Sequence, residues 1–317
     1  GKGKKLYGII FLGIYILLIS IMQSSSGTAA TYRVTKEIFR QETHYGLIQV
    51  LEGNHKHWRA LLTDFLVQNQ YSLTKKQSMS TPTYLLQALA AGYAEKIDSA
   101  LCIGLGAGIL PGQLSREGVR TDVVEINEAI VDVAARYFDF NPGSITLTID
   151  DARHYLQVSK KRYRVIFLDA FLNDGALFHL MTREAFATMR ERLEQDGILV
   201  INTLGDVNAE KDYLTASVFR TLNGVFPYVR VHALPDGRGG IFFVASSRPL
   251  KDVIPLPEPD TVHPVCRQDV TAVLNHRITP EAVYGTVLTD DYNPGAYYDA
   301  SRRESLRRHF YHQLQNL

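Results

Sequence analysis

The stretch Leu101-Cys-Ile-Gly-Leu-Gly-Ala-Gly-Ile-Leu110 decides the fold. An apolar strand runs into closely spaced glycines and then into a helix. Glycine lets the backbone turn tightly and approach a ligand that a Cβ would exclude. We therefore predict that Gly104, Gly106 and Gly108 contact a nucleoside cofactor. A packing turn between strand and helix is the alternative, because it can have the same composition.

The next expected strand, residues 121–126, carries an acidic residue near its end. Glu125 lies about twenty residues beyond the glycines, where an acidic side chain reaches the ribose hydroxyls of a bound nucleoside. A carboxylate can accept hydrogen bonds from both hydroxyls of a vicinal diol. An exposed glutamate at the end of a strand is the alternative interpretation.

Carboxylates also follow the next two expected strands. Asp150 and Asp151 come after residues 145–149, and either could accept a hydrogen bond from the exocyclic amine of adenine. One of the two could instead cap the following helix, which begins near Ala152. Asp169 follows four apolar residues and is expected at the carboxyl edge of the sheet, where ligands bind in open α/β folds. A carboxylate there can accept a proton or hold a cation.

The periodicity predicts an α/β chain with a small β-domain in front. Residues 31–78 contain short strand-like segments around a polar turn, which indicates β-hairpins. Residues 79–250 alternate apolar strands with amphipathic helices, which favours a mostly parallel, seven-stranded Rossmann-like sheet covered on both faces. Residues 251–317 form a C-terminal extension with an expected terminal helix. The expected strands are 100–104, 121–126, 145–149, 164–169, 197–203, 228–233 and 240–246.

The N-terminus is basic and then strongly apolar. Three lysines within residues 1–5 precede Leu6–Met22, a run of 17 residues without a charge. That run can just span the hydrocarbon layer, so residues 1–30 are predicted to be a transmembrane helix. A cleavable secretory signal is the alternative, and the chain could also be the end of a longer membrane protein.

Composition excludes some classes of function. The 34 basic and 33 acidic residues leave a net charge of +1, which is no broad cationic field, so nucleic acid is not an expected partner. Cys102 and Cys266 cannot build a zinc cluster or a disulfide framework by themselves. The histidines lack the spacing of metal ligands, so no metal is expected.

In this order and spacing, the four motifs resemble the spermidine synthase family of polyamine aminopropyltransferases, which has the class I methyltransferase-like fold. The resemblance covers about residues 34–312 and extends beyond the shared core. The segments that carry it are Glu42–Val50, Leu61–Gln68, Pro82–Tyr84, Asp169–Phe171, His179–Phe186, Asp196–Val200 and Thr289–Pro294. The later segments are similar to the membrane-fused branch of that family.

The resemblance implies decarboxylated S-adenosylmethionine as donor and a small-molecule amine as acceptor. It makes Asp169 the proton acceptor, Glu125 the ribose contact and Asp151, with its neighbours, the adenine contact. It also implies a possible homodimer. Because this donor is made in the cytosol, we expect a single-pass protein of the inner cell membrane with a cytoplasmic catalytic domain. Further residues implied are Gln68 and Ala152 at the donor, and Tyr84, Asp174 and Tyr292 at the acceptor.

Two departures from the family pattern concern the acceptor. The family places a second carboxylate three residues after the first, and here that position is Leu172. The tyrosine that usually contacts the diamine is replaced by the region 234–238. A methyltransferase that uses S-adenosylmethionine itself therefore stays open, as does a binding or scaffold module without catalysis.

Overall fold

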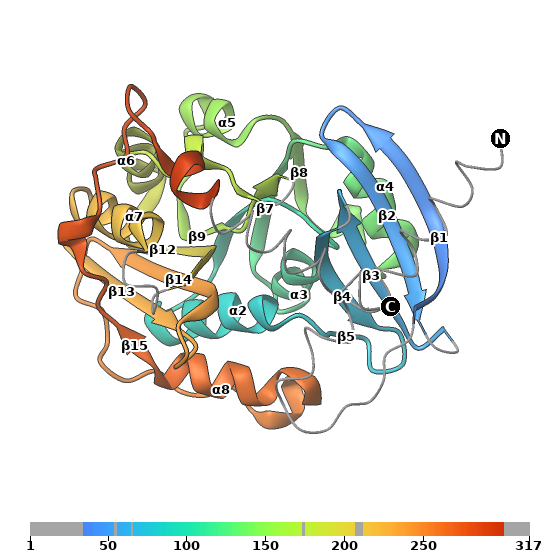
Figure 1. Cartoon of the computed structure of the whole chain (residues 1–317). Helices are drawn as coiled ribbons and strands as arrows, with labels where there is room; N and C mark the ends of the chain where they lie inside the picture. Colours follow the sequence, from blue (N-terminus) through green and yellow to red (C-terminus); the bar gives the residue numbers. More distant parts are fainter. Residues whose placement is uncertain (1–33, 54–55, 65, 173–174, 207–211, 301–317) are drawn as a thin grey trace, which may run out of the picture.

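The computed structural model describes residues 34–53, 56–64, 66–172, 175–206 and 212–300 (Figure 1). Within these ranges, no helix has both the length and the apolar character needed to cross a membrane. The predicted transmembrane helix within residues 1–30 lies outside the described residues. The predicted terminal helix at 301–317 does so too.

The chain begins with a five-stranded antiparallel sheet in which each strand pairs with the next. Trp58 is buried in its small core against Leu51, Leu62 and Met79. A Cβ at Gly53 would overlap the Trp58 ring, so a glycine is required there. The strands are β1 (Val34–Thr43), β2 (Gly46–Gly53), β3 (Trp58–Thr63), β4 (Leu66–Ser72) and β5 (Gln77–Ser78).

The central sheet has eight strands in the order β15-β13-β14-β12-β9-β6-β7-β8. Its strands are β6 (Ser99–Ile103), β7 (Arg120–Glu125), β8 (Thr146–Ile149), β9 (Tyr163–Leu168), β12 (Leu193–Asp206), β13 (Tyr228–Ala233), β14 (Arg238–Ser246) and β15 (Arg277–Ile278).

The prediction of seven strands was wrong in number, and the sheet is mixed rather than uniformly parallel. The five strands from β12 to β8 are parallel, but β14, β13 and β15 are antiparallel to their neighbours. β13 and β14 are joined by a short turn, which only an antiparallel pair allows. β15 lies in the C-terminal extension and has just two residues, too few to give a periodic signal.

Helices cover both faces of this sheet. Alternate residues of β6 point to opposite sides, so Cys102 belongs to one core cluster and Leu101 to the other. Buried residues of α2, α3, α4 and α8 join the first cluster, and those of α5, α6 and α7 join the second. The helices are α2 (Thr81–Tyr93), α3 (Ile109–Arg116), α4 (Glu128–Tyr137), α5 (Ala152–Val158), α6 (Arg183–Glu191), α7 (Tyr213–Asn223) and α8 (Arg267–Asn275).

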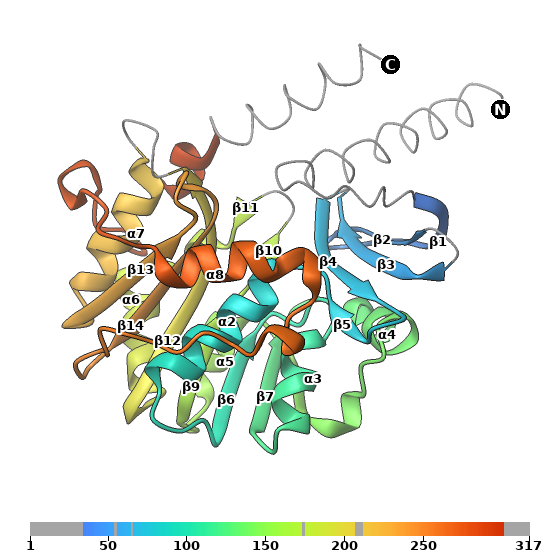
Figure 2. The same ribbon diagram turned by 90° about the horizontal axis from the view of Figure 1, so that it is seen from below.

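The five-stranded sheet lies beside α3 and α4, at one end of the central sheet (Figure 2). Two of the hydrogen bonds that hold it there involve the segment at the end of α4. Arg59 donates to the backbone oxygen of Tyr137 (3.0 Å), and the Tyr71 hydroxyl donates to Asp139 (3.2 Å). The strand β4 is thereby brought against the loop that precedes α3.

A buried histidine ties the opposite end of the sheet together. His232 on β13 is fully buried, and its Nδ1 donates to the Val273 backbone oxygen (3.1 Å). Its Nε2 is 2.8 Å from the Tyr93 hydroxyl, which donates to it because Nδ1 holds the proton of the neutral ring. Burial lowers the pKa of His232 to about 4. This neutral side chain therefore joins α2, β13 and α8.

Candidate nucleoside site

The predicted carboxylates and glycines meet at one edge of the central sheet. The parallel strands β9, β6, β7 and β8 are neighbours in that order, so their carboxyl ends lie side by side. The register confirms this, because Ile103 at the end of β6 pairs with both Leu168 and Val124. The residues placed there are Gly104 after β6, Glu125 on β7, Asp150, Asp151 and Ala152 after β8, and Asp169 after β9.

The three glycines are required by the packing of the loop. All three have positive φ angles of 95°, 53° and 72°. A Cβ at Gly104 would lie 2.6 Å from the backbone oxygen of Asp169, and one at Gly106 would lie 2.5 Å from Asn69 Oδ1. A Cβ at Gly108 would lie 2.5 Å from the Phe140 ring. Internal packing alone therefore explains these glycines, and a ligand role needs the neighbouring groups as evidence.

Glu125 anchors the same loop. Its side chain is buried, with the residue 9% exposed, and Oε2 accepts from the Leu105 backbone N–H (2.9 Å). Oε1 accepts from the Asn127 backbone N–H (2.8 Å). Burial raises the pKa of Glu125, and the backbone donors partly offset this effect. Each oxygen keeps acceptor capacity for a further donor, such as a ribose hydroxyl.

Asp151 is the N-cap of α5, as one of the two alternatives predicted. Its Oδ1 accepts from the backbone N–H groups of Arg153 (2.8 Å) and His154 (3.1 Å). Its Oδ2 lies 3.3 Å from His179 Nε2. An adenine amine at Asp151 would therefore share this second oxygen with His179. Asp150 is paired with the His154 ring at 2.6 Å.

Asp169 is held by Asn202, a residue that the sequence pattern did not single out. Its Oδ1 accepts from Asn202 Nδ2 (2.8 Å), and Asn202 lies on the neighbouring strand β12. Burial raises the pKa of Asp169, although the hydrogen bond from Asn202 works against this. The Asn202 Oδ1 atom is buried and has no hydrogen-bond partner among the described residues. The sequence signal was available, because Asn202 follows four apolar residues just as Asp169 does.

The small β-domain reaches the glycine loop through Asn69. Its Oδ1 accepts from the Ala107 backbone N–H (2.8 Å). Gln68, which the family resemblance favoured, makes no such bond to the loop. The register of β3 and β4 shifts between Leu61 and Leu62, so Gln68 is the extra residue of a β-bulge.

The residues predicted to bind the acceptor do not gather around Asp169 in the described part of the chain. Tyr84 is buried, and its hydroxyl donates to the Ser78 backbone oxygen (2.7 Å) and accepts from the His263 N–H (3.2 Å). Tyr292 is 59% exposed, in a turn closed by Thr289. No contact among the described residues joins either tyrosine to Asp169. Asp174 lies outside the described residues.

The C-terminal segment that contains Tyr292 connects α5 and α6 through Asp290. Asp290 accepts from the Thr182 hydroxyl (2.6 Å) and pairs with Arg153 on α5. Its backbone N–H donates to Glu184 Oε2 (3.0 Å). Arg153 in turn donates to the His179 backbone oxygen (3.1 Å). These bonds hold α5, and with it the Asp151 cap, against α6.

Residues 85–249 match the family model described as the spermine/spermidine synthase domain. An N-terminal histidine N-methyltransferase of Emericella nidulans is 30% identical over 251 residues, which are 70% of this chain and 44% of that protein. A probable polyamine aminopropyl transferase of Bifidobacterium longum is 29% identical over 227 residues, 69% of this chain and 49% of that protein. The chain spans about half the length of these two relatives.

The fold is also that of a solved relative. A probable spermidine synthase from Corynebacterium glutamicum superposes with a TM-score of 0.58 over 71% of this chain and 85% of that one. The two sequences are 18% identical, so the likeness supports the fold alone.

Proposed function

This chain belongs to the spermine/spermidine synthase family, and from that premise we propose that it transfers an aminopropyl group from decarboxylated S-adenosylmethionine to a small-molecule amine. In that reaction the neutral amine nitrogen attacks the carbon next to the sulfonium. The carbon–sulfur bond breaks, methylthioadenosine leaves and the amine loses a proton. The protein must therefore orient two reactants and accept one proton.

The placement of Asp169 carries this proposal. The residue is fixed at the edge of the sheet by a backbone bond from its N–H to the Ile103 oxygen (3.1 Å) and by the Asn202 amide. A raised pKa makes its carboxylate a stronger base than an exposed aspartate. It also follows the strand next to β6, directly beside the glycine loop. We therefore assign Asp169 as the acceptor of the amine proton.

The donor side of the proposal uses groups along the same edge. Glu125 would accept from the two ribose hydroxyls with the capacity that its backbone donors leave free. Asp151 and His179 would meet the adenine, with Ala152 beside them at the start of α5. Gln68 remains a proposed donor contact, next to Asn69 on β4. These assignments rest on position and hydrogen-bonding capacity.

The acceptor side favours an amine with few charges. A dicationic acceptor needs carboxylates near both ends to offset the loss of water. Leu172 stands where the family has the second of these carboxylates. We therefore propose a monoamine, rather than a diamine, as the acceptor.

Methyl transfer from S-adenosylmethionine is the second candidate. Leu172 favours it, since the diamine pocket is incomplete, and the similar Emericella nidulans protein is described as a methyltransferase. The glycine loop, Glu125 and Asp151 would suit either donor, because the two donors differ only by a carboxylate.

One assay and one titration separate the candidates. Purified full chain is incubated with decarboxylated S-adenosylmethionine and a panel of monoamines and diamines, and released methylthioadenosine is measured. Aminopropyl transfer predicts release with at least one amine. Calorimetric titration with both nucleosides follows. A clear preference for the carboxylated nucleoside, without methylthioadenosine release, would contradict the proposal and favour methyl transfer.

We also propose that the apolar segment Leu6–Met22 anchors the chain in the inner membrane with the catalytic part in the cytoplasm. The support is the uncharged run itself and the cytosolic source of the donor. Fractionation of cells that express the full chain should place it with membranes. A chain without residues 1–30 should appear in the supernatant, and equal partition of both would contradict the anchor.

A further inference from the structure

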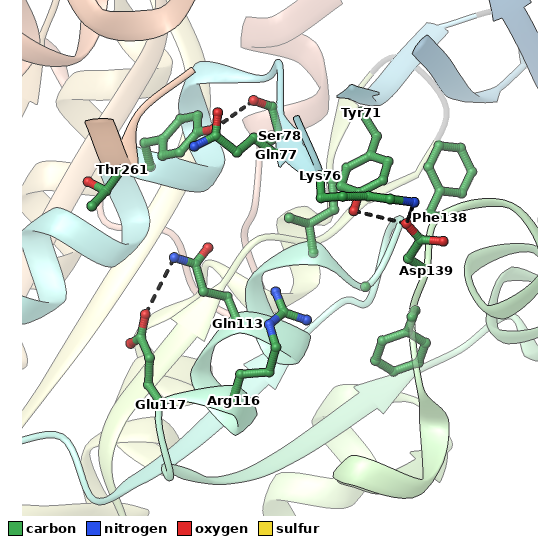
Figure 3. A pocket seen from close by; sticks show the side chains of 14 residues that line it. Tyr71, Lys76, Gln77, Ser78, Gln113, Arg116, Glu117, Phe138, Asp139 and Thr261 are labelled. Atoms are coloured by element: carbon green, nitrogen blue, oxygen red, sulfur yellow. Dashed lines mark hydrogen bonds and ion pairs between the residues drawn. The ribbon is translucent and has the colours of Figure 1, made fainter. Parts of the chain in front are cut away.

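A cavity of about 340 Å³ lies between α3 and the small β-domain (Figure 3). It is bounded by the β4–β5 region of the small β-domain, by α3 and by the segment 138–140. Gly108 belongs to its wall. The carboxylates of the proposed site, Glu125, Asp151 and Asp169, do not line it. The proposed nucleoside chemistry therefore leaves this cavity unexplained.

Two basic and two acidic side chains line the cavity, and three of the four have hydrogen-bond or ion-pair partners. Lys76 pairs with Asp139, which also accepts from the Tyr71 hydroxyl. Glu117 accepts from the side-chain amides of Gln87 (2.7 Å) and Gln113 (3.4 Å). Neither acidic side chain is therefore without a donor.

Arg116 is the exception. It ends α3 and lines the cavity, yet within the described part of the chain it makes no hydrogen bond or ion pair. Figure 3 shows its guanidinium among the lining side chains, between the Glu117–Gln113 pair and the Lys76–Asp139 pair. Of the charged side chains that line the cavity, Arg116 is thus the one without a hydrogen-bond or ion-pair partner among the described residues.

Part of the remaining wall is apolar, and part is formed by polar residues such as Gln77, Ser78 and Thr261. Ile109, Phe138 and Phe140 line the cavity beside the ring of Tyr71. Phe138 packs edge-on against Tyr71, with ring centroids 6.5 Å apart. The volume is at the lower end of the range of small-molecule sites. The volume of the cavity and the apolar part of its wall suit a compact ligand with an apolar body.

We propose that this cavity binds a small carboxylate with an aromatic or similar apolar body. The planar guanidinium of Arg116 matches a carboxylate with two parallel hydrogen bonds. Ile109, Phe138 and Phe140 then cover the body of the ligand. The site is separate from the proposed transfer reaction, and its test does not depend on turnover.

The test is calorimetric titration of the full chain with three probes of similar shape: phenylacetate, its neutral isostere phenylacetamide, and benzylamine. Phenylacetate should bind, and the two other probes should bind at least about tenfold more weakly, since they lack the anion. Inorganic phosphate tests whether the anion alone is sufficient, and it should also bind more weakly than phenylacetate.

Arg116→Gln should weaken phenylacetate binding at least about tenfold, because the paired charge is lost. Arg136→Gln is the matched control, since Arg136 is also an exposed helix arginine but does not line the cavity. The affinity of Arg136→Gln for phenylacetate should equal that of the wild type. Thermal unfolding should show that both variants are folded. The proposal is overturned if phenylacetate does not bind up to about 10 mM. The proposal is also overturned if Arg116→Gln binds phenylacetate as tightly as the wild type does. The same holds if phenylacetamide or phosphate binds the wild type as tightly as phenylacetate does.

Discussion

The donor side and the acceptor side of the proposed site are built in different ways. On the donor side, Glu125 accepts from the backbone amides of Leu105 in the glycine loop and of Asn127 before α4, and Asp151 caps α5. On the acceptor side, Leu172 replaces a carboxylate, and the Tyr84 hydroxyl is taken by Ser78 and His263. The donor residues stabilise the fold and would also bind the ligand, whereas the hydroxyl of the predicted acceptor residue Tyr84 is bonded within the fold.

This difference indicates which positions of the site can be substituted without disturbing the fold. A substitution at Glu125 would disturb the loop whatever the substrate, because two buried amides would lose their acceptor. At position 172, where the family has a carboxylate, we propose that a substitution would change acceptor recognition. We therefore expect this chain to use the donor of its family but an acceptor other than the family's diamine. The following variants test that contrast.

The largest effect is expected for Asp169→Asn. The amide cannot accept the amine proton, so kcat should fall about 10²–10⁴-fold. Donor affinity should change by less than about threefold, because the Glu125 and glycine-loop contacts remain. Methylthioadenosine release and calorimetry measure the two quantities. Asp132→Asn, at an exposed position on α4, should leave both unchanged. Turnover retained by Asp169→Asn would contradict the assigned proton acceptor.

The stability of the fold should depend on pH through His232, which joins α2, β13 and α8. Its pKa is about 4 in the folded protein and about 6.5 when unfolded, so the unfolded chain binds more protons between these values. The free energy of unfolding should therefore fall by about 3 kcal/mol as the pH drops from 7 to 4.

Denaturant unfolding at several pH values measures this loss. His232→Gln can keep both hydrogen bonds without titrating, so it should show a smaller loss over the same interval. An identical pH dependence in both proteins would exclude His232 as its source.

Next in size is the effect of Gly104→Ala. Its Cβ would meet the Asp169 backbone at 2.6 Å, and the φ of 95° strains any side chain. The loss of unfolding free energy should be about 2–3 kcal/mol, and donor affinity should fall with it. Gly118→Ala is the control, since its φ is also positive but a Cβ there has no neighbour within 4 Å. It should cost about 1–2 kcal/mol and leave donor affinity unchanged.

The smallest effect is expected for Leu172→Asp. Restoring the second carboxylate should lower the KM of a diamine about tenfold, because a carboxylate offsets the desolvation of the distal ammonium. The KM of a monoamine should stay the same. Steady-state assays with a diamine and a monoamine of equal length measure the difference. No change with the diamine would mean that position 172 does not set the acceptor preference.

Residues at the ends of apolar strands were predictable from the sequence. Glu125 and Asp169 follow runs of buried residues, and parallel strands bring such ends to one edge whatever the loops do. Asn202 carries the same signal, but an amide was not considered as a partner for Asp169. The alternation of strands and helices likewise gave the central sheet and its two covered faces.

Features that depend on irregular backbone or distant packing were not predictable. The β-bulge at Gln68 puts Asn69 against the loop, and a bulge breaks the two-residue period on which strand predictions rest. The two residues of β15 are too few to show any period. The cavity at Arg116 forms between separate segments, residues 71–84, 108–117 and 138–140 with Thr261, so local patterns do not reveal it.

A crystal structure of the full chain with methylthioadenosine tests the central claim most directly. It should place the ribose hydroxyls on Glu125, the adenine next to Asp151 and the sulfur towards Asp169. A nucleoside bound away from the carboxyl ends of β6 and β7, or a site closed by packed side chains, would contradict the assignment.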